Sequence, residues 1–196
     1  MGQVKLHVSM SLDGFTAGPG VSAGHPMGEG GTRLHEWLFA DPMDPADAEV
    51  ASAMYAPAKV GAVLMGRRHF DVGIAQWGDD GTFGMPCFVV THRPAEPVVK
   101  GPTTFEFVTD GPERALRMAR TSAGGRDVNV MGAEVTRQLL HAGLIDEIEI
   151  NLVPIVLGGG ASLFGGLKSE EITLEQIAVR PTSTVTHLRY RIVMSR

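Results

Sequence analysis

Residues 128–140 read VNVMGAEVTRQLL, and this stretch decides the fold. Its first four residues, three of them apolar, are typical of a buried strand, and Gly132 follows them directly. From Gly132 the pattern predicts a helix that extends to about His141 and is stopped by Gly143. Strands that alternate with helices in this way indicate a mainly parallel sheet covered on both faces.

The alternation continues outward from this unit. We predict further strands over residues 4–10, 60–65, 88–91, 104–108 and 145–153, and helices over residues 32–39, from 44 onward, and 113–122. Residues 172–180 and 184–194 alternate in polarity like antiparallel edge strands. The sequence therefore predicts a three-layer α/β/α fold with a mainly parallel mixed sheet and an antiparallel C-terminal strand pair. Residues 1–196 are expected to form one domain.

Composition narrows the class of protein. The chain has 196 residues, 43% of them hydrophobic and 20% charged, which is ordinary for a globular protein. A net charge of −5 argues against a nucleic-acid surface. We see neither a signal peptide nor an apolar run of the roughly 20 residues that cross a bilayer, so we expect a cytoplasmic protein without a membrane partner. Cys87, the single cysteine, lies in an apolar run and is expected to be a buried strand residue.

Three predicted strands end in groups that suit phosphate, and ligands of open α/β sheets lie beyond the carboxyl ends of strands. The first group is Gly66, Arg67 and Arg68, where the glycine allows close backbone approach and the arginines supply charge. A solvated strand-to-helix turn explains the same residues equally well. The second group is Thr91, His92 and Arg93, which suits a ribose phosphate; taken singly, it is better explained as a polar turn before Pro94.

The third group is the turn at Gly132, where unpaired N–H groups at the helix N-terminus suit a pyrophosphate. This turn is not the GxGxxG fingerprint of the Rossmann dinucleotide-binding unit. A Rossmann protein would also carry its glycine loop after the first strand, where this chain has Ser9-Met-Ser-Leu-Asp-Gly. An ordinary dehydrogenase is therefore disfavoured.

Taken together, the segments resemble the dihydrofolate-reductase-like superfamily. The closer resemblance is to the reductase domain of the bifunctional deaminase/reductase of bacterial riboflavin biosynthesis and to its stand-alone relatives. The matching pieces occur in the expected order across nearly the whole chain: SMSLDGF at 9–15, VLMGRR at 63–68, VTHRP at 90–94, VMGAEV at 130–135, LIDEI at 144–148, PIVLGGG at 154–160 and LF at 163–164.

The resemblance implies NADPH as cofactor. It assigns the phosphates to Gly66, Arg67 and Arg68, and the adenosine ribose phosphate to Thr91, His92 and Arg93. The pyrophosphate is assigned to the turn of Met131, Gly132, Ala133, Glu134 and Val135. The nicotinamide is assigned to Ser9, Phe15, Thr16 and Ala17. Many relatives have a glycine where Ala133 stands. Independently of the resemblance, Arg67 and Arg93 favour NADPH over NADH, because a 2′-phosphate rewards charge-assisted hydrogen bonds.

Catalytic and substrate-binding candidates carry weaker signals. Asp13 and Asp47 are the candidate acids, although Asp13 also fits an ordinary Asp-Gly turn and Asp47 or Asp44 also fits a helix cap. A glycine-rich loop over residues 17–31 precedes the further candidates and is long enough to be functional. Substrate-binding candidates are His35, Glu36, Trp37, Trp77, Leu157, Gly158, Gly159 and Gly160. The tryptophans fit loop anchoring in the core equally well, and the histidines lack metal-ligand spacing, so we expect no metal.

The leading hypothesis is an NADPH-dependent reductase of a small heterocyclic substrate: a pterin, a flavin or a ribosylaminouracil phosphate as in riboflavin biosynthesis. The chain lacks the zinc motif of an attached deaminase. Two alternatives remain open, a nucleotide-binding module without turnover of its own and a structural dimer whose groove has decayed. The apolar terminal strands suggest a homodimer.

Overall fold

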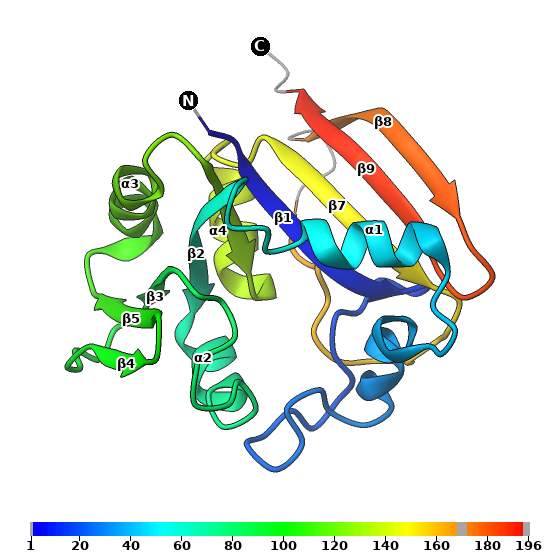
Figure 1. The fold of residues 1–196 in the computed structure, drawn as a ribbon, viewed down its shortest axis with the longest axis horizontal. Coiled ribbons are helices and arrows are strands. Elements are labelled where there is room, and N and C mark those ends of the chain that lie inside the picture. Colours follow the sequence, from blue (N-terminus) through cyan, green and yellow to red (C-terminus); the bar gives the residue numbers. More distant parts are fainter. Residues whose placement is uncertain (1, 168–171, 194–196) are drawn as a thin grey trace.

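The computed structural model describes residues 2–167 and 172–193. Nine strands of this part of the chain form one continuous sheet (Figure 1). They are β1 (Val4–Ser11), β2 (Val60–Gly66), β3 (Pro86–Val90), β4 (Val98–Lys100), β5 (Thr103–Val108), β6 (Asp127–Met131), β7 (Glu147–Val153), β8 (Thr173–Pro181) and β9 (Thr186–Val193).

The strand order is β4-β5-β3-β2-β6-β1-β7-β9-β8. The six strands from β5 to β7 in this order run parallel, whereas β4, β9 and β8 pair antiparallel with their neighbours. The mainly parallel mixed sheet with an antiparallel C-terminal pair is therefore confirmed.

Helices cover both faces of the sheet, which confirms the three layers (Figure 1). On one face α3 (Gly111–Ala123) and α4 (Ala133–His141) bury small and aliphatic side chains against β1, β2 and β6. The other face carries α1 (Pro45–Ala53), α2 (Arg67–Gly73) and the 3-10 helix η1 (Gly31–Phe39), which pack on two smaller apolar clusters. No helix in the described ranges is long and apolar enough to span a bilayer.

Local sequence explains most boundaries. Asp44 caps α1, because its carboxylate accepts a hydrogen bond from the Ala46 N–H at 2.8 Å, and Pro45 occupies the first turn. Cys87 is buried in β3 as expected. The short edge strand β4 was not predicted, because three residues after a proline-rich turn show no periodicity. β9 ends at Val193, and Met194, which the prediction included, lies outside the described residues.

Candidate functional site

The three predicted turns lie in a row. Strands β3, β2, β6 and β1 are adjacent and parallel, so the segments that follow them emerge at one edge of the sheet, which we call the carboxyl edge. In the pairing register Gly66 lies opposite Val90, and Met65 lies opposite Met131. With a strand spacing of about 4.8 Å, the row from β3 to β1 spans about 14 Å. This length suits an extended dinucleotide.

The turn after β6 is a close backbone approach. Gly132 adopts φ 87° and ψ 127°, a conformation that essentially only glycine reaches. A Cβ at this position would lie 3.3 Å from the Cβ of His69 and 3.8 Å from the Gly66 backbone nitrogen. No side chain caps α4, so its first N–H groups remain open to a ligand. In that first turn the buried hydroxyl of Thr136 has no hydrogen-bond partner among the described residues.

Arg67 and Arg93 are brought together by a residue that the sequence analysis did not single out. Asp71, one helical turn after Arg67, accepts hydrogen bonds from Nε of Arg67 at 2.7 Å and from a terminal nitrogen of Arg93 at 3.1 Å. The Arg67 guanidinium also lies over the ring of Phe107, 5.2 Å from its centroid. The turns after β2 and β3 therefore share one charged cluster, formed by Arg67, Arg93 and Asp71. We call this cluster the arginine pair with Asp71.

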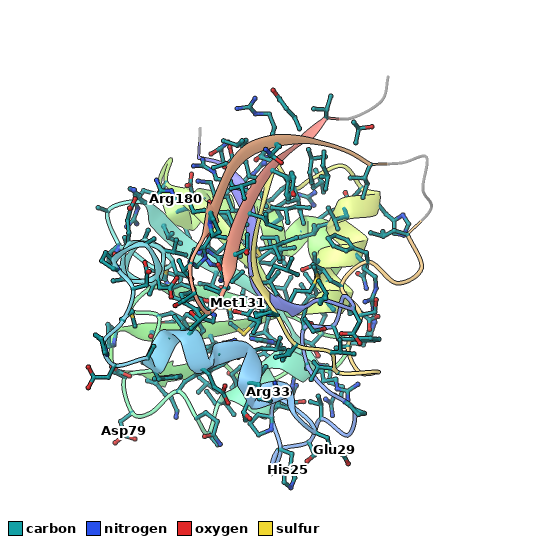
Figure 2. The ribbon with its side chains drawn as sticks, turned by 90° about the vertical axis from the view of Figure 1, so that its right-hand side faces the viewer. His25, Glu29, Arg33, Asp79, Met131 and Arg180 are labelled. Carbon is teal, nitrogen blue, oxygen red and sulfur yellow. The ribbon has the colours of Figure 1, made fainter. Side chains whose placement is uncertain are left out.

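Arg68 contacts the glycine-rich loop. Its guanidinium donates to the Val21 carbonyl at 3.4 Å, so the loop over residues 17–30 lies against the start of α2. His25 and Glu29 of this loop protrude at the periphery, whereas the half-buried Met131 lies nearer the middle of the view (Figure 2). The Tyr55 hydroxyl contacts the Met131 sulfur at 3.6 Å, which turns that side chain inward.

The segment after β1 packs on the glycine loop that follows β7. Phe15 bridges Ser162, and the N–H of Thr16 donates to the Ala161 carbonyl at 2.9 Å. A Cβ at Gly160 would lie 2.0 Å from the Ala17 oxygen, so only glycine fits there. The predicted nicotinamide segment and the predicted glycine loop are thus direct neighbours at the carboxyl edge.

Asp13 fastens this loop. Its carboxylate accepts hydrogen bonds from the Ser11 hydroxyl at 2.6 Å and from the N–H groups of Leu157 and Gly158 at 3.1 and 2.7 Å. The Ser11 hydrogen bond, followed by those backbone groups, lowers the pKa of Asp13. An ionised, fully engaged carboxylate favours the turn role that the sequence left open over a proton donor.

His69 lies beside the Gly132 turn, where a Cβ added at Gly132 would be 3.3 Å from the Cβ of His69. Burial, with a further contribution from the charge of His35, lowers the pKa of His69 to about 4, and burial also lowers the pKa of His35. His35 was a substrate-binding candidate, whereas His69 was missed. The available signal was its place in the quoted run VLMGRRHF, directly behind the two arginines.

The other substrate-binding candidates from the helix and loop differ in exposure. Glu36 is exposed, while Trp37 is 2% exposed and its Nε1 donates to the Ser9 hydroxyl at 3.1 Å. Trp77 stacks on Phe105 with ring centroids 5.6 Å apart inside an aromatic cluster. These placements favour the anchoring alternative for both tryptophans.

A second polar region lies on the face of the sheet beneath α1. In β1 the apolar side chains enter the α3–α4 core, while the residues between them, Lys5, His7, Ser9 and Ser11, point to the opposite face. There they meet polar partners from three other strands, β6, β7 and β9, and from α1. We call this set the polar face: Lys5, His7, Ser9, Asp47, Asp127, Asn129, Glu147, Glu149, Asn151, His187 and Arg189.

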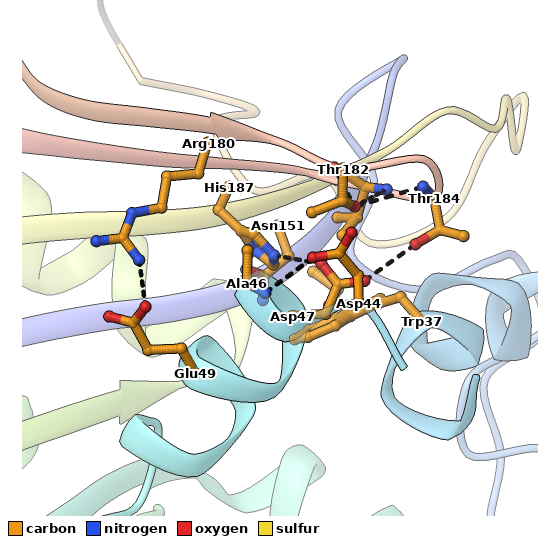
Figure 3. A network of polar contacts seen from close by, with 12 residues as sticks. Trp37, Asp44, Ala46, Asp47, Glu49, Asn151, Arg180, Thr182, Thr184 and His187 are labelled. Carbon is orange, nitrogen blue, oxygen red and sulfur yellow. Dashed lines mark hydrogen bonds and ion pairs between the residues drawn. The ribbon is translucent and has the colours of Figure 1, made fainter. Parts of the chain in front are cut away.

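A hydrogen-bonded chain of five side chains crosses this face, and Figure 3 shows its Asp47 end. Nδ1 of His7 lies 3.1 Å from Glu149, and Nε2 of His7 lies 3.0 Å from the Asn151 amide nitrogen. The Asn151 oxygen lies 2.7 Å from Nδ1 of His187, whose Nε2 lies 2.8 Å from Asp47. The Thr184 hydroxyl donates to the second oxygen of Asp47 at 3.2 Å. Asp47 is 1% exposed, so this candidate catalytic acid is buried at one end of the row of hydrogen bonds.

Neutral side chains supply one proton fewer than the contacts of this hydrogen-bonded row can use. Two neutral imidazoles and one amide supply three donors for the four contacts between Glu149 and Asp47. With Asn151 oriented as described, a proton for the fourth contact would lie between His187 and Asp47. With the Asn151 amide turned over, it would lie between His7 and Glu149. Burial raises the pKa of Glu149, but the hydrogen bond and charge of His7, with Lys5 and Arg189, outweigh it and lower that pKa.

A cavity of about 390 Å³ opens beside this chain. His7, Asn151 and His187 form part of its floor, and Val50, Ala53 and Met54 of α1 form an apolar wall. Its lining includes the first residues of β2 and β6, so the cavity lies toward the opposite edge of the sheet from the three turns. At its rim Arg180 and Glu49 form an ion pair of 2.8 Å. Its volume is that of a small-molecule site.

Comparisons with known proteins agree with this architecture. The model of the RibD C-terminal domain family matches residues 3–188. A proposed riboflavin biosynthesis protein from Shewanella sp. PV-4 superimposes with a TM-score of 0.71 at 22% identity, over 97% of this chain and 99% of its own. A pyrimidine reductase-like protein from Corynebacterium diphtheriae gives 0.62 at 13% identity, over 99% and 93%. At these identities the two structures support the fold. No curated protein matches the sequence.

Proposed function

Because this chain belongs to the RibD C-terminal domain family, a family of reductase-like domains, we propose that it is an NADPH-dependent reductase of a small heterocyclic substrate. The observation that carries the proposal is the row of phosphate-suited turns on the adjacent strands β3, β2 and β6. Neighbouring segments of this edge, after β1 and β7, complete a continuous rim for one elongated ligand.

The residues present fit NADPH. Gly132 leaves a cradle that a Cβ would fill, Thr136 has a buried hydroxyl without a partner among the described residues, and α4 offers open N–H groups. In the proposed pose Gly66, Arg67, Arg68 and the 131–135 turn hold the phosphates. Thr91, His92 and Arg93 hold the adenosine ribose phosphate, and Ser9 with residues 15–17 flanks the nicotinamide. When bound, NADPH supplies the hydride.

The chain's own residues then orient the substrate and supply a proton. We place the substrate at the carboxyl edge, beside the glycine loop and the neighbouring segment of residues 15–17. The Asp47–His187 pair, joined at 2.8 Å, is the proposed proton source. Asp13 keeps the glycine loop in place.

Three further properties belong to the same proposal. The continuous nine-stranded sheet supports one domain over residues 1–196. Exposed apolar residues Leu174 and Val179 on the edge strand β8 support a homodimer. The absence of a bilayer-length helix in the described ranges is compatible with the cytoplasmic location expected from the sequence.

Nucleotide titration tests the cofactor assignment. NADPH should bind more tightly than NADH, and Arg67→Ala or Arg93→Ala should weaken NADPH binding about tenfold or more, since each removes a charge-assisted hydrogen bond. Arg114→Ala on α3, at the opposite face of the sheet, is the matched control and should leave affinity unchanged. Equal affinity of the unmodified protein for NADH and NADPH contradicts the assignment.

Turnover is tested separately by incubating the protein with NADPH and a panel of oxidised pterins, flavins and aminopyrimidines. Loss of NADPH absorbance that depends on one compound supports a reductase and names its substrate class. Tight NADPH binding with no substrate-dependent loss favours the nucleotide-binding module instead. No nucleotide binding at all contradicts both.

A further inference from the structure

The arginine pair that would receive the 2′-phosphate already shares a carboxylate. Asp71 holds Nε of Arg67 at 2.7 Å and a terminal nitrogen of Arg93 at 3.1 Å. These groups come from two different turns, one after β2 and one after β3, and Asp71 is the only carboxylate that pairs with either among the described residues.

Fold stability does not account for this arrangement. The side chains of Asp71 and Arg93 are 39% and 70% exposed, and ion pairs at that exposure contribute at most about 1 kcal/mol. What the carboxylate does change is the charge of the cluster, which falls from +2 for the arginines to +1 for all three groups.

The geometry leaves the donors that a phosphate needs. Arg67 uses Nε for Asp71 and rests on Phe107, so its two terminal nitrogens have no hydrogen-bond partner in the described part of the chain. Arg93 contributes one terminal nitrogen to Asp71 and keeps its other nitrogens equally open. A phosphate is therefore able to bind the two guanidiniums while Asp71 keeps them in place.

The same carboxylate suits the cofactor without a phosphate. In nucleotide sites an acidic side chain accepts hydrogen bonds from ribose hydroxyls, whereas arginine accommodates a 2′-phosphate. Here both kinds of group stand at one point, and the carboxylate repels a phosphate dianion while it remains an acceptor for a hydroxyl.

We propose that Asp71 is a specificity-determining residue that limits the preference for NADPH over NADH and keeps NADH a usable ligand of the same site. This inference rests on the proposed function. It predicts that NADPH binds better than NADH by a smaller factor than two arginines alone would give.

Calorimetric titration of the full chain with NADPH, NADH, adenosine 2′,5′-bisphosphate and 5′-AMP tests it. Asp71→Asn keeps the shape and one acceptor oxygen but removes the charge. We expect the NADPH-to-NADH affinity ratio to rise about fivefold at low salt, from the Coulomb repulsion of one charge about 6 Å from a phosphate dianion. The gain should shrink at high ionic strength and should be reproduced by the two adenosine nucleotides.

Glu175→Gln on β8 is the matched control, since it makes the same change of net charge on the edge strand at the opposite end of the sheet. An unchanged or lower ratio in Asp71→Asn, with nucleotide binding intact, overturns the inference; a lower ratio assigns Asp71 to aligning the arginines. Asp71→Ala provides a second variant, and it should raise the ratio while weakening NADH binding. Failure of the unmodified protein to bind any of the four nucleotides would overturn the proposed function itself, so the two failures are distinguishable.

Discussion

The carboxyl edge and the polar face are both rich in polar groups, but they differ in how those groups are satisfied. At the edge, the α4 N-terminus is uncapped, Thr136 lacks a partner among the described residues, and Arg67 keeps free donors. On the polar face Asp47 and His187 are buried and hydrogen-bonded at close to 2.8 Å. Open groups are available to a ligand, whereas the contacts of a closed network also stabilise the fold, whatever further role its members have.

This difference separates two kinds of function that charged residues perform. Substitutions at the edge should change affinity and leave the fold largely intact. Substitutions on the polar face should first change stability, because a buried charge that loses its partner has no water to replace it. The two regions should therefore respond differently to substitution and to acid.

Removal of Asp47 should give the largest effect. Asp47→Ala leaves His187 buried opposite an empty position and releases the Thr184 hydroxyl. We expect the free energy of unfolding to fall by about 3–5 kcal/mol, as measured by urea denaturation. Glu49→Ala, on the same helix but exposed, is the control and should cost less than 1 kcal/mol. A similar small loss for both variants would remove the distinction between the two regions.

Acid should destabilise the edge through His69. The folded protein favours neutral His69, with a pKa of about 4, whereas the unfolded chain takes up this proton near pH 6.5. Its stabilising contribution is therefore complete above about pH 6.5 and is lost as the pH falls toward 4, by about 2–3 kcal/mol. The difference in unfolding free energy between the unmodified protein and His69→Gln should shrink by that amount over this range. A difference that is constant with pH would show that His69 titrates normally.

Gly132→Ala tests whether the edge depends on backbone shape. A side chain at φ 87° is strained and its Cβ would press on His69 at 3.3 Å. We expect a loss of about 1–3 kcal/mol in thermal unfolding together with weaker NADPH binding. Gly124→Ala, at a helix end with open space around the added Cβ but a similar positive φ of 61°, separates backbone strain from loss of the site. Equal NADPH affinity in Gly132→Ala and the unmodified protein would count against the pyrophosphate assignment.

Arg180→Ala should have the smallest effect. Its ion pair with Glu49 joins side chains that are 51% and 67% exposed, so solvent screens it. We expect less than about 0.5 kcal/mol in urea denaturation. A loss of several kcal/mol would mean that the rim of the cavity belongs to the closed network.

The sequence predicted the edge better than the polar face for a physical reason. Each turn at the edge is contiguous, so Gly66, Thr91 and Gly132 are recognisable with their neighbours, and parallel pairing then brings their strand ends together. The contact between Asp47 and His187 joins residues 140 positions apart, and only the fold reveals it. Asp71 was hidden in the same way, since its second partner, Arg93, follows a different strand.

One signal for the polar face was present in the sequence but was not used. Residues 4–11 read VKLHVSMS, which alternates strictly, although β1 lies in the middle of the sheet with a parallel partner on each side. A central strand covered on both faces is usually apolar throughout. Polar residues at every second position therefore indicate a polar layer beneath a helix.

That alternation also determines the register in which β1 pairs with its neighbours. If β1 shifted by one position against β7, Lys5 and His7 would turn into the aliphatic layer around Leu116 and Leu139, and Leu6 would face Glu147. Each displaced charge would cost several kcal/mol. A misaligned folding intermediate would therefore be destabilised on both faces of the sheet. The lysine and histidine of the first strand thereby reject wrong pairings during folding.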